Sequence, residues 1–252
     1  MSFIAQTNSA NEWKTIVNAI SIIVEEASFE ATPEGIQFRG MDPSHVAMID
    51  LNWPNASFEK YECDKEFKLT LRIEELSKLI KRAKQNNSIS ISAEDDEYLI
   101  VKLENGRKRE FQIRLIESSQ SPQQVPKLAL DSKIVIDKGV FEDTLNDVGA
   151  VADHITIETN NDEIKFIGNG DAGKAEITLN KSDEGVSEIS SKVESKATYS
   201  LQYLLSILKA IGTTAETISI EYSNKMPFKI EFRLGEVGGY INFYLAPRID
   251  DR

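Results

Sequence analysis

The stretch IQFRGMDPSHVAMIDL at residues 36–51 recurs 128 residues later as IKFIGNGDAGKAEITL at residues 164–179. Identical residues at this offset include Ile36, Phe38, Gly40, Ile49 and Leu51 of the first copy. Trp13 and Phe141 carry the match upstream without a gap. Because self-similarity at a fixed offset marks a repeated structural unit, we expect one fold used twice in tandem.

The length of 252 residues agrees with two domains, each long enough to bury a core of its own. We place the first domain at residues 1–117, a connecting loop at 118–132 and the second domain at 133–252. The loop is expected because residues 117–126 carry two prolines and no apolar periodicity.

Composition narrows the classes of function. The net charge is −12, whereas domains that grip nucleic acid through overall charge are normally basic. Either the chain avoids nucleic acid, or a local basic surface contacts it.

The single cysteine, Cys63, excludes an internal disulfide framework. Asn18, Ser21 and Glu25 interrupt the apolar run after Trp13, so we expect neither a signal peptide nor a membrane span, and a soluble intracellular protein.

Periodicity predicts an α+β fold. Apolar residues at helical spacing indicate helices at about residues 13–23, 72–84, 140–152 and 200–211. Alternating runs between them predict about nine strands in each repeat, in antiparallel sheets that the helices cover on one face. The strands at 109–116 and 174–180 have no evident partner on one side, and an open strand edge invites pairing with another chain.

No motif indicates catalysis. Gly168-Asn-Gly170-Asp-Ala-Gly173 matches a dinucleotide-binding pattern, but that pattern requires a helix to begin there, and the following residues alternate like a strand. A glycine-rich turn is therefore the preferred interpretation, with a nucleotide-dependent enzyme left as an alternative. His45 and His154 lack neighbours at metal-ligand spacing, so we expect no metal, no cofactor and no enzyme activity.

Two segments point to binding instead. The predicted helix at 72–84 carries five cations against Glu74 and Glu75, which is either a solvated face or a phosphate-contacting one. The loop at 40–48, GMDPSHVAM, has apolar residues on both sides of a turn, which is either a docking surface or a loop packed into the core.

Gly40-Met-Asp-Pro-Ser-His-Val-Ala, together with Tyr244-Leu-Ala-Pro-Arg-Ile near the C-terminus, resembles the proliferating cell nuclear antigen family of DNA sliding clamps. The similarity extends over essentially the whole chain and is closest to the archaeal members. It implies the DNA-clamp fold, in which helices line a ring and antiparallel sheets form its outside. It also implies a processivity factor without catalytic residues, acting in the archaeal cytoplasm, or in the nucleus if the source is eukaryotic.

The resemblance further implies how the ring assembles and what it binds. Three subunits would join head to tail around double-stranded DNA, without reading its sequence. The alternative is one subunit of a specialised, checkpoint-type heterotrimer. The interface residues implied by the strands at 109–116 and 174–180 are Arg109, Phe111, Ile113, Lys174, Ile177 and Leu179.

DNA contacts are expected on the inner helices. The residues concerned are Lys14, Lys78, Lys81, Arg82, Lys84 and Lys209. The helix expected at 140–152 departs from the family pattern, because it offers Glu142, Asp143 and Asp147 and no cation. We therefore expect an uneven positive lining, with attraction to DNA concentrated on residues 72–84.

Partners of this family carry a short peptide with a glutamine, an aliphatic residue and two aromatic residues. DNA polymerase, the clamp loader, flap endonuclease and DNA ligase are the partners that the resemblance implies. The implied peptide site comprises Met41, His45, Val46, Met48, Val125, Pro126, Pro227, Tyr244, Leu245, Ala246 and Pro247.

Overall fold

The chain divides into two compact units. The computed structural model describes residues 2–117, 123–171, 173–212 and 215–249. Unit 1 comprises Met1–Val125 with Arg233–Ile241, and unit 2 comprises Pro126–Phe232 with Asn242–Arg252. Part of the expected connecting loop, residues 118–122, lies outside the described residues, and residues 123–131 contain neither helix nor strand.

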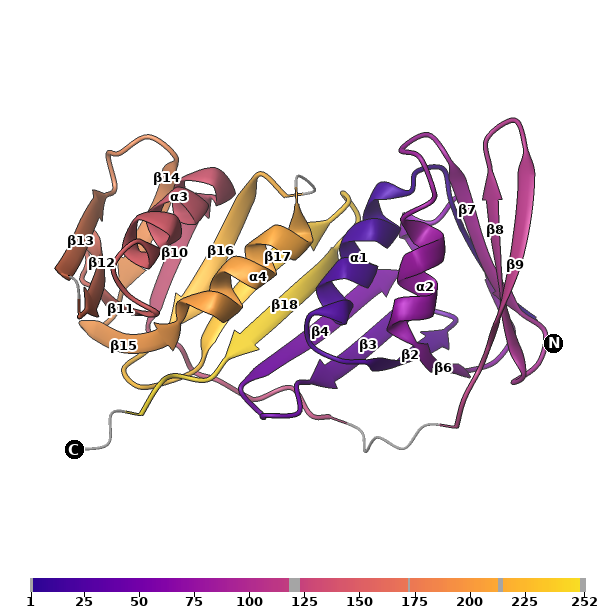
Figure 1. Cartoon of the computed structure of the whole chain (residues 1–252), viewed down its shortest axis with the longest axis horizontal. Coiled ribbons are helices and arrows are strands. Elements are labelled where there is room, and N and C mark those ends of the chain that lie inside the picture. The colour runs from indigo at the N-terminus through magenta and orange to yellow at the C-terminus, as the bar shows by residue number, and fades with distance from the viewer. Residues whose placement is uncertain (1, 118–122, 172, 213–214, 250–252) are drawn as a thin grey trace. The chain divides into compact units, whose positions relative to one another are not determined.

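The first repeat has antiparallel strands and two helices (Figure 1). Its strands form one sheet in the order β5-β1-β7-β8-β9 and a second run in the order β4-β3-β2-β6. The elements are β1 (Phe3–Thr7), α1 (Asn11–Ser21), β2 (Glu26–Thr32), β3 (Gly35–Met41), β4 (Ala47–Pro54), the short turn η1 (Asn55–Ser57), β5 (Lys60–Cys63), β6 (Phe67–Arg72), α2 (Ile73–Ile80), β7 (Ser88–Ala93), β8 (Tyr98–Glu104) and β9 (Lys108–Arg114).

The second repeat follows the same order of elements, as the sequence offset predicts. Its strands run β13-β12-β11-β15 in one sheet and β14-β10-β16-β17 in another run. The elements are β10 (Ser132–Asp137), α3 (Lys138–Gly149), β11 (His154–Thr159), β12 (Glu163–Gly170), β13 (Gly173–Asn180), β14 (Val186–Ser191), β15 (Ser195–Ser200), α4 (Leu201–Ile211), β16 (Thr217–Tyr222), β17 (Phe228–Leu234) and β18 (Gly239–Leu245).

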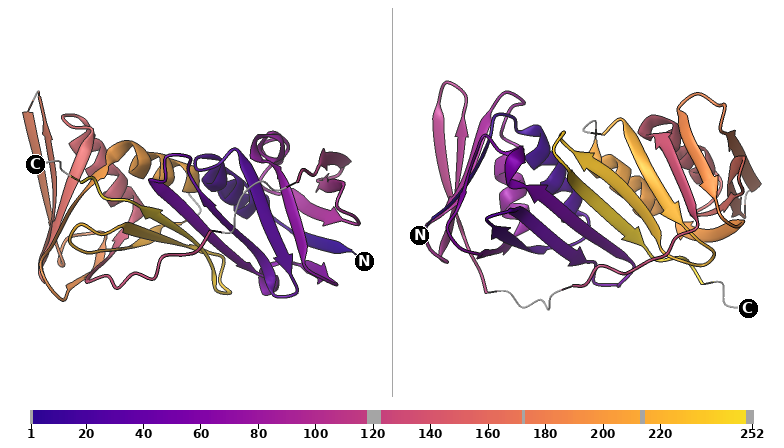
Figure 2. Two further views of the ribbon diagram at one scale, coloured as in Figure 1. Left: turned by 90° about the horizontal axis from the view of Figure 1, so that it is seen from below. Right: turned by 180° about the vertical axis from the view of Figure 1, so that it is seen from behind.

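Each helix is held on its unit by one apolar stripe. In α1 the stripe includes Trp13, Ile16, Val17 and Ile20, all at most 2% exposed. Burying one such side chain contributes about 1.5–3 kcal/mol to folding. Figure 2 shows the helices of each unit on one face of its sheets, which is the predicted α+β arrangement.

The second helix is shorter than predicted. We expected it at residues 72–84, but α2 ends at Ile80 and the chain continues in tight turns to Ala83. The cause is Asn87, whose buried side-chain oxygen accepts the Lys84 N–H while the backbone N–H of Asn87 donates to the Lys84 carbonyl. Such local side-chain bonds compete with helix continuation, and periodicity alone does not reveal them.

The repeat is visible in the packing of equivalent residues. Trp13 and Phe141 occupy matching core positions, and each packs against an aromatic residue of a strand in its own unit, Trp53 at 4.7 Å and Phe166 at 5.9 Å between ring centroids. Gly168 lies so close to α3 that an added Cβ would approach the Val148 Cγ1 to 2.6 Å. The glycine is needed because helix and strand meet there without room for a side chain.

Gly170 gives a direct test of this close approach. A Cβ at Gly170 would overlap the carbonyl oxygen of Val151, just beyond the end of α3. We expect Gly170→Ala to lower the free energy of unfolding by about 3 kcal/mol or more, because backbone must shift to relieve the overlap. Urea denaturation measures it. The matched control is Gly139→Ala within α3, where nothing lies within 4 Å and the helix should gain about 0.5–1 kcal/mol. Equal stability of Gly170→Ala and the unmodified protein would contradict this account of the packing.

Candidate functional site

The glycine-rich loop is a hairpin turn. Gly170 ends β12 and Gly173 begins β13, so a strand follows the loop where a dinucleotide site needs a helix. The prediction of a structural turn is therefore confirmed, and the nucleotide-enzyme alternative loses its only motif. Across the described residues, no group of three or more His, Cys, Asp or Glu side chains is placed to hold a metal ion.

The basic segment after β6 is partly neutralised by its own helix. Lys78 lies on α2 and its ammonium contacts the Glu74 carboxylate at 2.6 Å, an interaction that lowers the pKa of Glu74. Lys81 is the C-cap of the helix, while Arg82 and Lys84 lie beyond its end, so these three cations are not on the helix itself. All four side chains are exposed. Lys81, Arg82 and Lys84 thus form an exposed basic turn after α2.

The other helices differ in charge. Lys14 is half-buried on α1, and Lys209 is exposed in the last turn of α4. On α3, Asp143 and Asp147 are exposed, and Glu142 is bound by Lys138 at 2.7 Å. The acidic surface predicted for this helix is present, and its bounds are Lys138–Gly149 where residues 140–152 were expected.

Residues 42–46 form the turn between β3 and β4, which is held by a buried carboxylate. Asp42 is 6% exposed. Its side chain accepts the N–H groups of Val46 at 2.7 Å and Ala47 at 2.6 Å through Oδ1, and of Ser44 at 3.1 Å through Oδ2. These bonds hold His45 at a φ of 58°, a left-handed conformation that costs free energy for a residue with a side chain. The turn is thus pre-organised, with His45 exposed and Met41 and Val46 half-buried.

Part of the predicted peptide site is core. Met48 is 3% exposed, Tyr244 8% and Leu245 1%, so these residues support a surface from beneath. Val125, Pro126, Pro227, Ala246 and Pro247 are half-buried. For Met48 the structure supports the alternative in which the loop packs into the core. Met41 and Val46 are half-buried and keep accessible apolar surface.

The segment after β18 lines a cavity in unit 2 that the sequence did not point to. Its volume is about 510 Å³, and its walls are residues 196–198, Asn224, Lys225 and Pro247–Ile249. The Arg248 N–H donates to the Thr198 carbonyl at 2.7 Å, which fixes the segment against β15. Sequence analysis missed Lys196, Lys225 and Arg248 because they come from three separate segments, and no spacing rule relates them.

The two strands that we expected at the edges of sheets, at residues 109–116 and 174–180, are edge strands in the structure. β9 is the last strand of its sheet beside β8, and β13 is the last beside β12. In an antiparallel pair, residues that bond to the neighbouring strand alternate with residues whose N–H and C=O groups point away from it. The Leu115 N–H donates to the Glu97 carbonyl at 2.8 Å, so Leu115 belongs to the set that bonds to the neighbouring strand. Hence Arg109, Phe111 and Ile113 bond to β8, and the backbone groups of Glu110, Gln112 and Arg114 point to the open side.

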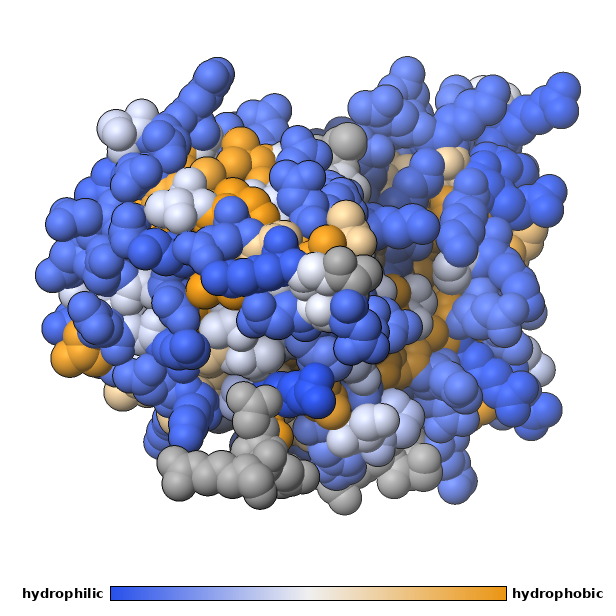
Figure 3. All heavy atoms as spheres, turned by 60° about the vertical axis from the view of Figure 1, so that its left-hand side comes forward, coloured by the Kyte–Doolittle hydropathy of each residue, from blue (hydrophilic) through white to orange (hydrophobic). Residues whose placement is uncertain are grey.

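β13 presents apolar side chains at its edge. Ala175, Ile177 and Leu179 are half-buried and alternate with exposed residues. Figure 3 shows apolar atoms breaking a largely hydrophilic surface on the side of the molecule where β13 lies. This combination of apolar side chains and an unpaired edge is typical of a surface that another chain covers.

Tandem α+β units with open-edged sheets and helices on one face define the class of clamp proteins. The family model of the proliferating cell nuclear antigen N-terminal domain matches residues 2–120, and that of the C-terminal domain matches residues 124–248. The chain therefore belongs to the proliferating cell nuclear antigen family, and its function is that of a DNA sliding clamp.

Similar proteins cover the whole length. The DNA polymerase sliding clamp of Nitrosopumilus maritimus is 50% identical over 250 residues, which span 99% of this chain and 100% of that protein. That of Cenarchaeum symbiosum is 46% identical over 99% of each chain. The crystal structure of PCNA from Thermococcus kodakaraensis superimposes with a TM-score of 0.93 at 25% identity, covering 98% of this chain and 100% of that one.

The Asp42 network predicts the behaviour of the turn. In Asp42→Asn the amide nitrogen cannot accept the Ser44 N–H and the charge that strengthens the other two bonds is lost. We expect the free energy of unfolding to fall by about 1–3 kcal/mol and the Val46 and Ala47 amides to exchange faster with deuterium. Ser44→Ala, which removes only an exposed hydroxyl, is the control and should change neither. Unchanged exchange in Asp42→Asn would mean that the carboxylate does not hold the turn.

Proposed function

We propose that the chain assembles head to tail into a trimeric ring that encircles duplex DNA and tethers DNA polymerase and other enzymes to it. The observation that carries this proposal is the pair of open strand edges, β9 in unit 1 and β13 in unit 2. When two different surfaces of a chain meet head to tail, repeating the contact produces a closed ring if the rotation between copies brings the last copy back to the first. Three copies per ring is the number that the family implies. In this role the chain is a processivity factor with no chemistry of its own. Within the described residues no helix has the length and apolarity to cross a membrane.

The proposed subunit contact combines backbone pairing with side-chain packing. The backbone groups of Glu110, Gln112 and Arg114 would pair with β13 of the next subunit, extending the sheet across the interface. The proposed side-chain contacts are those of the predicted residues, Arg109, Phe111 and Ile113 on β9 and Lys174, Ile177 and Leu179 on β13. Ile113 is 4% exposed and also belongs to the core of unit 1, so its substitution is a poor test.

Gln112 provides the sharper test. Gln112→Pro removes an outward N–H donor while leaving the bonds of Phe111 and Ile113 to β8 in place. We expect light scattering to give a mass near 28.3 kDa for the variant, and near three times this value for the unmodified chain and for the control Gln112→Ala. A trimer of Gln112→Pro at low micromolar concentration would place the interface elsewhere. A monomer of the unmodified chain would favour the alternative, a subunit that needs different partners to complete a heterotrimer.

The proposed DNA contact uses phosphates only, since a clamp that slides cannot depend on base identity. Lys81, Arg82 and Lys84 are the main candidates, because each is exposed and Lys78 is already bound to Glu74. Lys14 and Lys209 are weaker candidates on α1 and α4. The exposed Asp143 and Asp147 on α3 would repel phosphates, so the attraction to DNA is uneven around the ring.

Salt dependence tests this assignment. Changing Lys81, Arg82 and Lys84 together to alanine should weaken binding to duplex DNA and reduce the slope of log K against log salt by about 0.9 for each lost contact. A matched control changes Lys60, Lys65 and Lys68 to alanine, removing the same charge from exposed positions in and beside β5 and β6. Asp143→Lys should instead strengthen DNA retention. An equal slope for the two triple variants would remove the turn after α2 from the DNA contact.

Partner peptides have a candidate surface in each unit. In unit 1 it is the turn held by Asp42, with Met41, His45 and Val46 accessible. In unit 2 it is the segment Ala246 and Pro247 after the buried end of β18. We propose that the glutamine-aliphatic-diaromatic peptides of DNA polymerase, clamp loader, flap endonuclease and DNA ligase bind these surfaces, with aromatic anchors supplying most of the affinity.

A further inference from the structure

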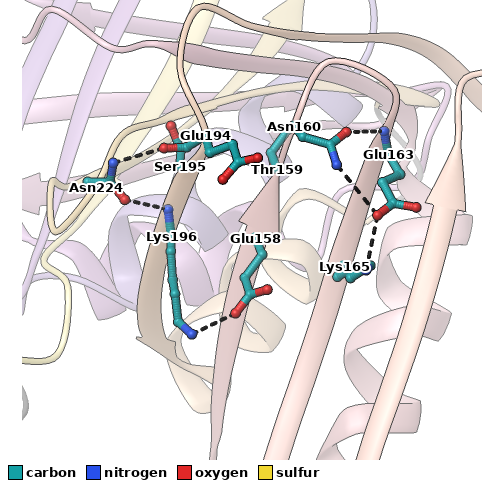
Figure 4. Close-up of a pocket in the computed structure, with 9 residues that line it drawn as sticks. All are labelled: Glu158, Thr159, Asn160, Glu163, Lys165, Glu194, Ser195, Lys196 and Asn224. Atoms are coloured by element: carbon teal, nitrogen blue, oxygen red, sulfur yellow. Dashed lines mark hydrogen bonds and ion pairs between the residues drawn. The ribbon is translucent and has the colours of Figure 1, made fainter.

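The cavity beside the C-terminal segment is a built site within unit 2. The Lys196 N–H donates to the Asn224 side chain at 2.8 Å, and that side chain donates to the Glu194 carbonyl at 2.9 Å (Figure 4). Lys225 adopts a left-handed φ of 54°, and its N–H lies 3.3 Å from the Lys196 carbonyl oxygen. With the Arg248 bond to Thr198, three separate segments are thus fixed around one space of about 510 Å³.

The lining of this cavity combines apolar surface with positive charge. Ala197, Pro247 and Ile249 are apolar, and Ile249 is 84% exposed. Lys196, Lys225 and Arg248 are cationic, and among the residues that the structure describes, which end at Ile249, no acidic one lines the cavity. Such a rim is unusual in a chain of net charge −12, and it favours a ligand that carries a carboxylate beside an apolar group.

The three cations are not equally engaged. The Lys196 ammonium contacts Glu158 at 2.7 Å (Figure 4). In the part of the chain that the structure describes, neither Lys225 nor Arg248 has a carboxylate within 4 Å, and Arg248 contacts only one ring nitrogen of His154, at 2.9 Å. Most of the donors of the Arg248 guanidinium therefore remain for a ligand, and their planar arrangement suits a carboxylate.

A neighbouring cavity of about 440 Å³ has the opposite character. It shares Lys196 and Asn224 with the first but is lined by Glu158, Glu163 and Glu194. Two of these acids are paired within the site, Glu158 with Lys196 and Glu163 with Lys165 at 3.0 Å. Figure 4 shows these pairs along β11, β12 and β15. With three acids against Lys165 and Lys196, this side keeps a net negative charge and is less favourable for an acidic ligand than the side of Lys225 and Arg248.

We propose that this cavity binds an acidic residue flanking the docking peptide of a partner protein, with the carboxylate between Lys225 and Arg248 and a neighbouring apolar side chain against Pro247 and Ile249. The inference rests on the proposed function, because it assumes that partner peptides reach the C-terminal segment. It adds a preference for acidic flanking residues. Partners with the same glutamine-aliphatic-diaromatic core would then differ in affinity according to the residues beside that core.

Titration calorimetry with three peptides tests the proposal. The peptides share the core and carry two Glu residues before it, two Glu residues after it, or Gln at all four positions. We expect one of the acidic peptides to bind about fivefold to tenfold more tightly than the neutral one at low salt, and the ratio to shrink as salt rises. A Lys225→Glu, Arg248→Glu double variant should reduce that ratio to one or below. Lys192→Glu, a charge reversal in the same unit outside both cavities, is the matched control and should keep it.

The outcomes separate the inference from the function beneath it. If the neutral peptide shows no binding to the unmodified protein, the proposed peptide docking fails. If all three peptides bind equally well, docking stands and the acidic preference is wrong. Deleting residues 250–252 removes Asp250 and Asp251, the nearest acids in sequence, and should keep or increase the ratio. A ratio that survives in the double variant would place the acidic contact elsewhere and overturn the assignment to Lys225 and Arg248.

Discussion

Each helix of this chain has one apolar stripe, which it must bury inside the unit to which it belongs. This constraint fixes which positions are left for function. Residues between the stripes, such as Lys78, Lys209 and Asp143, remain exposed and can change charge without disturbing the core. It also explains the glycines. At Gly168 and Gly170 of β12, close to α3 and the turn that follows it, the backbone has no space for a Cβ, so the first two glycines of the nucleotide-binding pattern are explained by packing.

Much of the fold follows from sequence because the signals are periodic. The 128-residue offset predicts the equivalence of Trp13 and Phe141, which both lie in the core, and the order of helices and strands in each repeat. The end of α2 could not be predicted, since it depends on one buried asparagine whose hydrogen bonds to Lys84 replace the helical ones. The same holds for Met48, where an alternating strand pattern does not say whether a residue beside a turn is covered.

The candidate sites were predictable to different degrees. Family motifs pointed to the turn at Asp42 and the segment at Pro247, and the structure adds how each is held, by three side-chain bonds and by the Arg248 N–H. A count of charges does not show which of them form ion pairs. The net charge of the basic segment therefore overstated the charge that Lys78, which is paired with Glu74, can offer to a phosphate. For the cationic cavity the sequence pointed only to the segment at Pro247, because residues 196, 225 and 248 meet only in the folded unit.

The alternation of β9 has a consequence for how subunits choose one another. Its outward backbone groups repeat every second residue, at Glu110, Gln112 and Arg114, which corresponds to about 6.8 Å along the strand. Main-chain hydrogen bonding is therefore nearly indifferent to a slide of two residues, and it is equally blind to which copy of a related gene supplied the opposing strand. In the proposed pairing, register and identity would be read from side chains such as Arg109 and Phe111. A cell holding several clamp genes could thus evolve self-sorting or mixed assemblies by changing a few edge side chains, with the backbone framework left intact.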